Sequence, residues 1–268
     1  MPEPRANRGV MGQGDFGWQR TIDGFARSLA PATLAFLYPD RCQICRRGRA
    51  RADDGYVCTN CREGSGGVRF IRPPFCHRCG LPYPGEATMQ FQCGNCAELD
   101  LQFSQARAAV VAQSLTLDII HRYKYHRALW FEPFLAELLI NAAAPALVGS
   151  GIDWLVPIPL HPLKRREREF NQAERLAARL GKAAGLCLNT KLLRRVENTA
   201  TQTLLTRGER AENMRGAFAM RSADDLQGRR IVLIDDVLTT GATASACARV
   251  LRAAGANEVQ VWTVARGV

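Results

Sequence analysis

Two adjacent carboxylates stand directly after a short apolar run near the carboxyl end of the chain. Residues 231–234 read IVLI, Asp235 and Asp236 follow, and five small residues, TTGAT, occupy 239–243. The apolar and mostly β-branched run is typical of a strand that is buried on both faces of a parallel sheet. The alanine-rich segment 243–254 favours a helix. The loop between such a strand and helix lies at the carboxyl end of a sheet, where open α/β folds bind ligands.

The small residues of this loop favour a phosphate site. They allow the backbone to curl until several amide N–H groups and hydroxyl groups converge on one point, beside the positive end of the helix dipole. The spacing and the lysine of the common nucleotide P-loop are missing. The residues expected to bind the phosphate are Thr239, Thr240, Gly241, Ala242 and Thr243.

The two carboxylates need a different target, because they repel phosphate. Ribose hydroxyls are natural partners for Asp235 and Asp236, so the acids and the loop together predict a site for a sugar 5-phosphate with free hydroxyls. Adjacent acids at a strand end also occur as turn caps or as solvent-facing residues. That alternative stays open from the acids alone, and the Thr and Gly run beside them favours the functional interpretation.

Eight of the ten cysteines form four C-x-x-C pairs in the first hundred residues. A C-x-x-C turn places two thiolates on one knuckle, and two knuckles complete a four-cysteine zinc site. Disulfides or a redox C-x-x-C are weaker alternatives, because the start of the chain carries no secretion signal and four tandem pairs do not resemble one reactive pair. The predicted zinc ligands are Cys42, Cys45, Cys58, Cys61, Cys76, Cys79, Cys93 and Cys96.

Sequential pairing of these knuckles predicts two zinc ribbons, at residues 42–61 and 76–96. Each intervening segment has about the length of a hairpin and contains turn residues, which favours this pairing. A cross-braced arrangement, which joins the first knuckle to the third and the second to the fourth, stays open from spacing alone. Either arrangement fills all four ligand positions, so both zinc ions are expected to be structural. The two isolated cysteines, Cys187 and Cys247, are expected to be small core residues.

Composition and charge narrow the class of protein. The chain has 268 residues, 47% of them hydrophobic, and a formal net charge of +11, which suits phosphate-bearing molecules or nucleic acid as partners. No run approaches the roughly eighteen consecutive apolar residues of a membrane helix, so membrane insertion is not expected. The first residues lack the apolar stretch of a signal peptide, which favours a cytoplasmic location.

The pattern along the chain predicts its organisation. Residues 1–20 are expected to form a disordered tail, 21–40 a short helical segment, 41–100 the double zinc ribbon and 105–268 the main domain. Predicted strands and helices alternate in this last part, which argues for an α/β fold with a largely parallel sheet flanked by helices. Helices are predicted near 115–125, 131–141 and 171–184, and strands near 108–112, 154–158, 192–196, 217–220, 231–234 and 259–264.

Taken together, these motifs resemble a known family. The apolar run, the paired acids and TTGAT are similar to the signature of type I phosphoribosyltransferases, which bind phosphoribosyl pyrophosphate (PRPP) with Mg2+. The stretch VPIPLHPLKRREREFNQAERLA at 156–177 and the pair Lys124 and Tyr125 resemble elements of the ComF family, whose competence-associated members join a zinc-ribbon amino terminus to a phosphoribosyltransferase-like domain. The same holds for the run that contains Thr201, Gln202, Arg210 and Asn213. The resemblance covers the chain from roughly residue 34 to the end.

The resemblance implies a Mg2+-dependent phosphoribosyltransferase whose acceptor the sequence does not reveal. Asp235 and Asp236 would hold the ribose hydroxyls and serve catalysis, and residues 239–243 would bind the 5-phosphate of PRPP. The pyrophosphate side of the implied site consists of Pro159, Leu160, His161, Lys124, Arg165 and Arg168. The basic run at 164–168 is otherwise typical of a solvated face, and that alternative stays open.

The resemblance also implies a second class of function. Competence-associated members of the family suggest a non-catalytic or weakly catalytic factor that handles incoming single-stranded DNA together with a helicase. A basic chain with zinc ribbons suits DNA phosphates as well as PRPP, and the two roles are compatible.

Glu169 departs from the family pattern. It stands where the family usually has Gly before Phe-Asn-Gln, in a segment that resembles a flexible lid over the substrate. We expect the missing glycine to stiffen this segment and the added carboxylate to weaken its attraction for pyrophosphate.

Overall fold

The computed structural model describes residues 40–85, 93–197, 216–221 and 225–268. The expected tail at 1–20 and, apart from Asp40, the expected helical segment at 21–40 lie outside the described residues. The same is true of Thr201, Gln202, Arg210 and Asn213.

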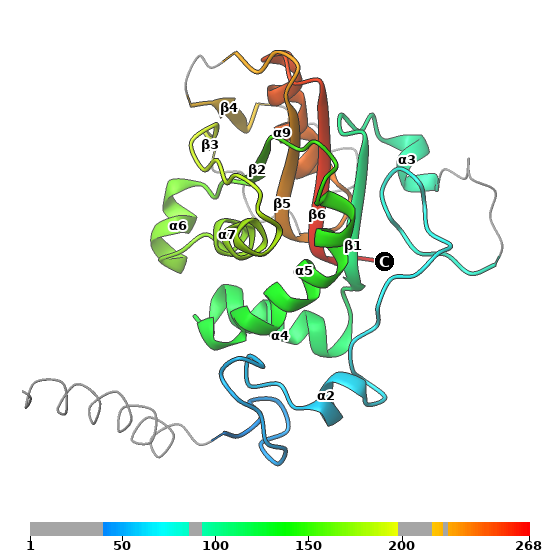
Figure 1. Ribbon diagram of the computed structural model, residues 1–268, viewed down its shortest axis with the longest axis vertical. Helices are drawn as coiled ribbons and strands as arrows, with labels where there is room; N and C mark the ends of the chain where they lie inside the picture. The colour runs from blue at the N-terminus through cyan, green and yellow to red at the C-terminus, as the bar shows by residue number, and fades with distance from the viewer. Residues whose placement is uncertain (1–39, 86–92, 198–215, 222–224) are drawn as a thin grey trace, which may run out of the picture. The chain divides into compact units, whose positions relative to one another are not determined.

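A four-stranded parallel sheet forms the centre of the main domain (Figure 1). Its order is β1-β6-β5-β2, and all three strand pairs are parallel. The two central strands, β5 and β6, consist largely of buried residues, as expected for strands covered on both faces. The prediction of a mostly parallel sheet flanked by helices is confirmed. The strands span Gln105–Val111 (β1), Trp154–Pro157 (β2), Arg230–Leu238 (β5) and Glu258–Arg266 (β6).

Helices cover both faces of this sheet, and alternating side chains of β5 contribute to the core on each face. Ile231 and Leu233 belong to the core that contains α9 and the second group of cysteines. Val232 and Ile234 belong to the opposite core, beneath α4, α5 and α7, which Figure 1 shows together on one side of the sheet. The helices span Ser114–Tyr125 (α4), Glu132–Leu147 (α5, after a 3-10 turn at Leu129–Phe131), Gln172–Ala184 (α7) and Ala242–Ala253 (α9).

Two of the predicted strands form a separate sheet. In the described chain, β3 (Leu193–Arg195) pairs antiparallel with β4 (Phe218–Met220), and neither pairs with the parallel strands. Leu193 and Phe218 enter the α9-side core, whereas Arg194 is exposed. Strands with one buried and one solvated face favour antiparallel pairing, which explains their separation from a sheet that is buried on both faces.

Short helices escaped the sequence prediction. α6 (Pro162–Arg168) starts with a proline at its first position, and the Nδ1 atom of His161 accepts a hydrogen bond from the amide of Leu163 (3.3 Å). The basic run therefore lies on a helix, with Arg165 exposed and Arg168 half-buried. Two further helices begin directly after a knuckle cysteine, at Thr59–Glu63 (α2) and Gly94–Glu98 (α3).

Glu132 joins the three helices on one face of the sheet. It stands at the start of α5 and is 4% exposed. Its carboxylate accepts hydrogen bonds from Tyr123 of α4 (3.2 Å) and from Arg175 and Arg179 of α7. Desolvation opposes the charge, but the two guanidinium groups outweigh it and lower the pKa of Glu132. The buried carboxylate stays charged and fixes α4, which also carries Lys124, against its neighbours.

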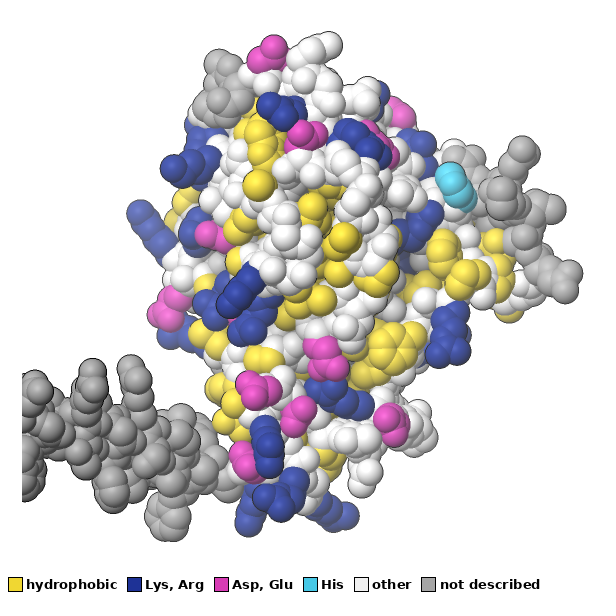
Figure 2. All heavy atoms as spheres, viewed as in Figure 1, with side chains coloured by type: hydrophobic (Ala, Val, Ile, Leu, Met, Phe, Trp, Pro, Cys, Tyr) yellow, Lys and Arg dark blue, Asp and Glu magenta, His cyan; other side chains and the backbone are white. Residues whose placement is uncertain are grey.

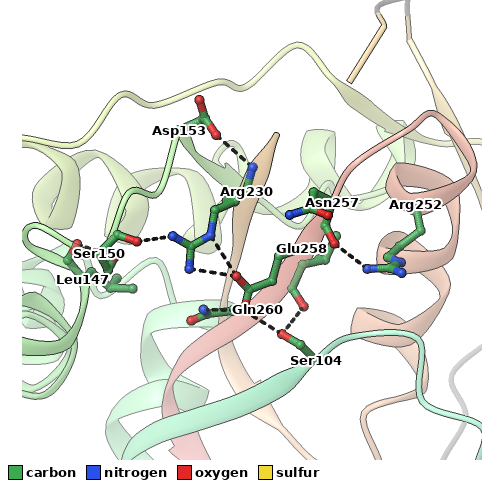
Figure 3. Close-up of polar contacts among 10 residues, drawn as sticks. Ser104, Leu147, Ser150, Asp153, Arg230, Arg252, Asn257, Glu258 and Gln260 are labelled. Atoms are coloured by element: carbon green, nitrogen blue, oxygen red, sulfur yellow. Dashed lines mark hydrogen bonds and ion pairs between the residues drawn. The ribbon is translucent and has the colours of Figure 1, made fainter. Parts of the chain in front are cut away.

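Arg230 ties the strands together at the amino end of β5 (Figure 3). Its Nε atom donates to Glu258 of β6 (2.9 Å), and its guanidinium also donates to the carbonyl of Ser150. Its backbone amide donates to Asp153, directly before β2 (2.8 Å). Ser104, before β1, donates to Glu258 as well (3.3 Å). These contacts hold the sheet at the end opposite to the paired aspartates.

Basic side chains are spread over the visible surface. In the view of Figure 2, Lys and Arg side chains lie among Asp and Glu side chains, and several of them lie over the side formed by α6 and α7. None of the helices in the described parts of the chain combines the length and the apolar character that a bilayer crossing requires.

Cys247 is buried, as expected for a core residue, but the same expectation for Cys187 is wrong. Cys187 is exposed, and its backbone carbonyl accepts a hydrogen bond from Leu155 of β2 (2.8 Å). The backbone of this segment therefore pairs with the sheet while the thiol faces outward.

Candidate functional site

β5 extends past its neighbour β2 and carries the acidic pair on that extension. β2 ends at Pro157, which is opposite Ile234, whereas β5 continues to Leu238. From Asp235 onward the ladder partner of β5 is β6, where Asp235 lies opposite Thr263. The prediction that the strand ends at residue 234 is wrong, because pairing with β6 keeps the backbone extended. The side that β2 leaves uncovered is the carboxyl-end position at which open α/β sheets bind ligands.

The two carboxylates leave β5 on opposite faces, because consecutive strand residues alternate. Asp236 is 4% exposed, and its Oδ1 atom lies 2.8 Å from Nζ of Lys124 on α4. Asp235 is half-buried, accepts a hydrogen bond from the amide of Asp236 (2.9 Å) and interacts electrostatically with Arg195 of β3. One acid is therefore held in a buried ion pair, while the other is partly open to solvent.

Burial controls the ionisation of this group of residues. Desolvation and the neighbouring Asp236 carboxylate raise the pKa of Asp235 to about 7, against the opposing effect of Lys124. Desolvation disfavours the charge of Lys124, but the two carboxylates outweigh it and raise the pKa of the ammonium above its ordinary value. Near neutral pH, Asp235 can therefore gain or lose a proton, which is a property of general bases.

The expected phosphate loop makes a tight turn from β5 into α9. Gly241 is buried and has a φ of +86°, a backbone conformation that residues other than glycine rarely adopt. The hydroxyl of Thr240 accepts a hydrogen bond from the amide of Ala242 (3.3 Å). Thr239 is exposed, and Thr243 is half-buried. Small residues are required here because the turn is closely packed and leads directly into the helix.

The residues expected on the pyrophosphate side fall into two places. Lys124 lies beside the acids, and the charge of Arg168 acts on it. The guanidinium of Arg168 lies over the ring of Tyr125, 4.8 Å from its centroid. Arg165 instead pairs with Glu174 (3.3 Å). The structure therefore places Lys124 at the acidic pair, with the charge of Arg168 acting on Lys124, and directs Arg165 to Glu174.

Pro159, Leu160 and Arg165 line a pocket of about 190 Å3 beside the loop that follows β2. Neither Asp235 nor Asp236 is among the described residues that line it. Three more arginines that the sequence analysis did not assign to the site line the same pocket. They are Arg194, Arg195 and Arg221.

The sequence contains no motif that would have assigned these three arginines to the pocket. Arg195 packs over the ring of Phe218 on β4 (5.4 Å), so its position depends on pairing between segments that are distant in the chain. Asn171 was predicted as part of a helix and of the family's Phe-Asn-Gln element, and the structure gives it a further role. It accepts from the amide of Ala173 and donates to the carbonyl of Ile158 (both 3.1 Å), which ties the loop after β2 to α7.

Glu169 adopts a backbone conformation that suits the glycine of the family pattern. It ends α6 in the left-handed region, with a φ of +67°. Its carboxylate forms an exposed ion pair with Arg127 (3.0 Å). The left-handed conformation costs a non-glycine residue about 1 kcal/mol, whereas exposed ion pairs contribute little.

The eight predicted zinc ligands gather into two groups of four. Within each group all sulfurs lie within 4.8 Å of one another, at Sγ–Sγ distances of 3.7 and 3.8 Å in the first and 3.5 and 3.8 Å in the second. Zn–S bonds of about 2.3 Å in tetrahedral geometry place sulfurs about 3.8 Å apart, so both groups fit a structural zinc ion. The first cluster is Cys42, Cys45, Cys58 and Cys61, and the second cluster is Cys76, Cys79, Cys93 and Cys96. Sequential pairing is confirmed, and the cross-braced arrangement is wrong.

Comparison with known protein families gives two matches along the chain. Residues 33–97 match the double zinc ribbon domain, and residues 172–267 match the phosphoribosyl transferase domain. The chain is 30% identical over 235 residues to Competence protein F of Haemophilus influenzae, a match that covers 84% of this chain and 96% of that protein. The chain belongs to the ComF family.

Two other relatives show that the ComF similarity spans most of the chain. DNA utilization protein YhgH of Salmonella typhimurium is 31% identical over 232 residues, which is 85% of this chain and 97% of that protein. Competence protein ComFC of Streptococcus pneumoniae is 34% identical over 216 residues, which is 81% of this chain and 90% of that protein. The resemblance inferred from the motifs is confirmed.

The geometry of the two cysteine groups predicts two zinc ions per molecule of this ComF protein. Elemental analysis of protein prepared under reducing conditions should give about two zinc ions per chain. Cys45→Ser and Cys96→Ser should each remove one ion and leave the other in place, because the groups share no ligand. Zinc content near zero in the unsubstituted protein would contradict the assignment.

Glu169→Gly should stabilise the protein. Relief of the left-handed strain contributes about 1 kcal/mol, which corresponds to a rise in Tm of about 2 °C in a thermal melt. Glu169→Ala is the matched control, since it removes the same carboxylate but keeps the strain, and its Tm should not rise. A lower Tm for the glycine variant would show that the ion pair with Arg127 outweighs the backbone strain.

Proposed function

We propose that this ComF protein binds PRPP with Mg2+ at the carboxyl end of β5 and transfers its phosphoribosyl group to an acceptor. The observation that carries the proposal is the position of the acidic pair. Asp235 and Asp236 lie on the part of β5 that extends past the end of β2, directly before the tight turn into α9. Both residues fall within the segment 172–267 that matches the phosphoribosyl transferase domain.

In the proposed complex, the two ends of the ribose phosphate are recognised by different chemistry. The turn at 239–243 would receive the 5-phosphate, where the start of α9 favours negative charge and small residues allow close approach. Asp235 and Asp236 would accept hydrogen bonds from the vicinal ribose hydroxyls. Because Asp236 is already paired with Lys124 (2.8 Å), its position is fixed before the ligand arrives.

The transfer would break the bond between the anomeric carbon and the pyrophosphate oxygen and form a bond from that carbon to the acceptor. The reacting sugar passes through a state with oxocarbenium character, as in glycosyl transfer generally. Asp235 is the better placed of the two acids to take the proton that the acceptor releases. Its pKa of about 7 suits a general base, whereas Asp236 is engaged by Lys124.

The departing pyrophosphate carries concentrated negative charge, which the chain would balance on the side of Lys124 and Arg168. The loop with Pro159, Leu160 and His161 would approach from the end of β2, and Arg165 would act from the adjoining arginine-lined pocket. Bound Mg2+ would supply further charge neutralisation, held mainly by substrate oxygens and water.

Removal of both carboxylates tests the proposed site. Asp235→Ala combined with Asp236→Ala should weaken Mg2+-dependent PRPP binding at least about a hundredfold, because two charge-assisted hydrogen bonds to the ribose are lost. Isothermal titration calorimetry measures the effect, and zinc content reports on folding. Asp153→Ala is the matched control, since it removes an aspartate at the opposite end of the sheet. Affinity that is unchanged in the double variant would refute the site.

The raised pKa of Asp235 predicts a pH-dependent affinity. Ribose hydroxyls donate to a carboxylate, so binding strengthens as Asp235 loses its proton. Between pH 6 and pH 8 the ionised fraction rises from roughly one tenth to nine tenths for a pKa of about 7. PRPP affinity should rise about five- to tenfold over this range relative to Asp235→Asn, which controls for ionisation of the ligand itself. A constant ratio between the two proteins would contradict the assignment.

A second candidate function, binding of single-stranded DNA, is favoured by one surface feature. Tyr125 is 59% exposed beside Lys124, with the guanidinium of Arg168 over its ring, and the ring of His121 is 4.8 Å away. Exposed aromatic rings flanked by cations are a typical platform for stacking unpaired bases. The names of the relatives, which refer to competence and DNA utilization, support this role. A helicase partner and a cytoplasmic location belong to the same proposal, as the family resemblance implies.

Single-stranded oligonucleotide binding measured by fluorescence anisotropy tests this second function. Affinity should fall steeply as salt rises, and Tyr125→Ala should weaken it about fivefold or more. Phe70→Ala removes an exposed aromatic ring elsewhere and should leave the affinity unchanged. Equal affinity of the wild-type protein and the Tyr125 variant would argue against the stacking platform.

A further inference from the structure

Arg266, at the end of β6, joins the second cysteine cluster to the phosphate loop. The side chain is 2% exposed. Its Nε and Nη2 atoms donate to the carbonyl oxygen (3.1 Å) and to Sγ (3.5 Å) of Cys79. Its Nη1 atom donates to the carbonyls of Leu238 (3.0 Å), Thr239 and Gly267. A single planar guanidinium thus bonds a zinc ligand on one side and the start of the 239–243 turn on the other.

Two more contacts connect the same parts of the chain. The hydroxyl of Ser245, in the first turn of α9, accepts from the amide of Gln102 (3.0 Å) and donates to the carbonyl of Asp100 (3.3 Å). Gly241 faces the ring of Phe103, and a Cβ at this position would lie 3.4 Å from that ring. Residues 100–103 follow α3, the short helix that contains Cys96, the last ligand of the second cluster. The turn therefore rests on the second zinc ribbon as well as on the sheet.

The first cluster makes different connections. Arg62, next to its last ligand, pairs with Glu137 of α5 (2.8 Å) and lies over the ring of Phe134 (4.9 Å). Arg122 of α4 donates to the carbonyl of Gln43 (3.3 Å). Within the described residues, these contacts join the first cluster to α4 and α5, on the face of the sheet opposite to α9. The first cluster is therefore an internal control for any effect of the second.

A zinc ion with four thiolates carries a net charge of about −2, and in the second cluster all four sulfurs belong to buried cysteines. A buried guanidinium needs such a partner. With the ion present, the knuckle that contains Cys79 is rigid and holds Arg266 in the orientation that bonds the loop. Without the ion, the four sulfurs are no longer held together, so Arg266 loses its fixed partner and the carbonyls of Leu238 and Thr239 lose their common donor.

We propose that Arg266 is a positioning residue through which zinc at the second cluster sets the affinity of the 239–243 turn for phosphate. The inference rests on the proposed phosphate site and adds a control of that site by the amino-terminal ribbon. Zinc at the first cluster has no corresponding effect. Because coupling between two binding sites is reciprocal, a sugar phosphate bound at the turn must also strengthen zinc binding at the second cluster.

Equilibrium competition in the full-length chain tests the reciprocal effect without a substitution at Arg266. Zinc retention is measured against increasing chelator, with and without saturating ribose 5-phosphate. Cys96→Ser and Cys45→Ser proteins identify which ion is which. The Cys45→Ser protein keeps only the second cluster intact, and the ligand should raise its zinc affinity about tenfold. The Cys96→Ser protein keeps only the first cluster intact, and the ligand should leave its zinc affinity unchanged. An equal effect on both clusters, or on neither, overturns the inference.

Calorimetry with ribose 5-phosphate separates this failure from failure of the proposed function. If the wild-type protein shows no binding, the phosphate site itself is wrong and the inference falls with it. If the wild-type protein binds, Cys96→Ser should bind about tenfold more weakly, and Cys45→Ser within twofold of wild type. Unchanged affinity of Cys96→Ser would overturn the coupling alone.

Arg266→Lys supplies the residue-level test. Lysine keeps the charge but offers a point-like ammonium that cannot bond Cys79 and the loop carbonyls in one plane. With both zinc ions retained, its affinity for ribose 5-phosphate should fall about tenfold, and the ligand should no longer strengthen zinc binding. Arg62→Lys, the matched substitution at the first ribbon, should change neither quantity. Normal affinity and normal linkage in Arg266→Lys would remove the residue from the proposed connection.

Discussion

The extension of β5 beyond β2 is the constraint on which the rest of the site depends. Backbone hydrogen bonds to β6 keep residues 235–238 extended beyond the point where pairing with β2 ends. Side chains alternate along the strand, so Asp235 acts electrostatically on Arg195 of β3 and Cys247 of α9, whereas Asp236 pairs with Lys124 of α4. A shorter strand would place both acids in a solvated loop, without the desolvation that raises the pKa of Asp235 or the buried pairing with Lys124.

Each layer around the sheet supplies one part of this site. On one face, Glu132 holds α4 against α5 and α7, so that Lys124 reaches Asp236. On the other face, α9 begins at Gly241 and rests on the segment after the second cysteine cluster. The zinc-ribbon region is therefore part of the scaffold of the proposed site, and we infer that Arg266 makes the affinity of the turn depend on zinc at the second cluster. Polar contacts around Arg230 secure the far end of the same strands.

Local patterns in the sequence were enough to predict much of this architecture. The C-x-x-C spacing gave both cysteine groups and favoured their sequential pairing, because the ligand pairs are close in the chain. Apolar periodicity predicted the helix near 115–125 and the strands of the parallel sheet, because those patterns record burial. The motif around Asp235 identified the part of the chain that matches a phosphoribosyl transferase domain.

The parts that sequence reasoning missed depend on contacts between distant segments. The length of β5 is set by its pairing with β6, which the acids at 235 and 236 gave no reason to expect. Arg195 comes close enough to interact electrostatically with Asp235 because β3 pairs with β4. Arg266 reaches Cys79 because the last strand ends beside the second ribbon. Glu169 adopts its left-handed conformation at the end of α6, a helix that was not predicted because its basic residues showed no apolar periodicity.

A ribose 5-phosphate is proposed to bind at the carboxyl end of β5. A crystal structure of the full chain with ribose 5-phosphate would show directly where this ligand binds. We expect the phosphate within hydrogen-bonding distance of the 239–243 backbone amides and the sugar hydroxyls at the carboxylates of Asp235 and Asp236. Ligand bound only in the pocket lined by Arg165 and Arg221, with the turn at 239–243 empty, would contradict it.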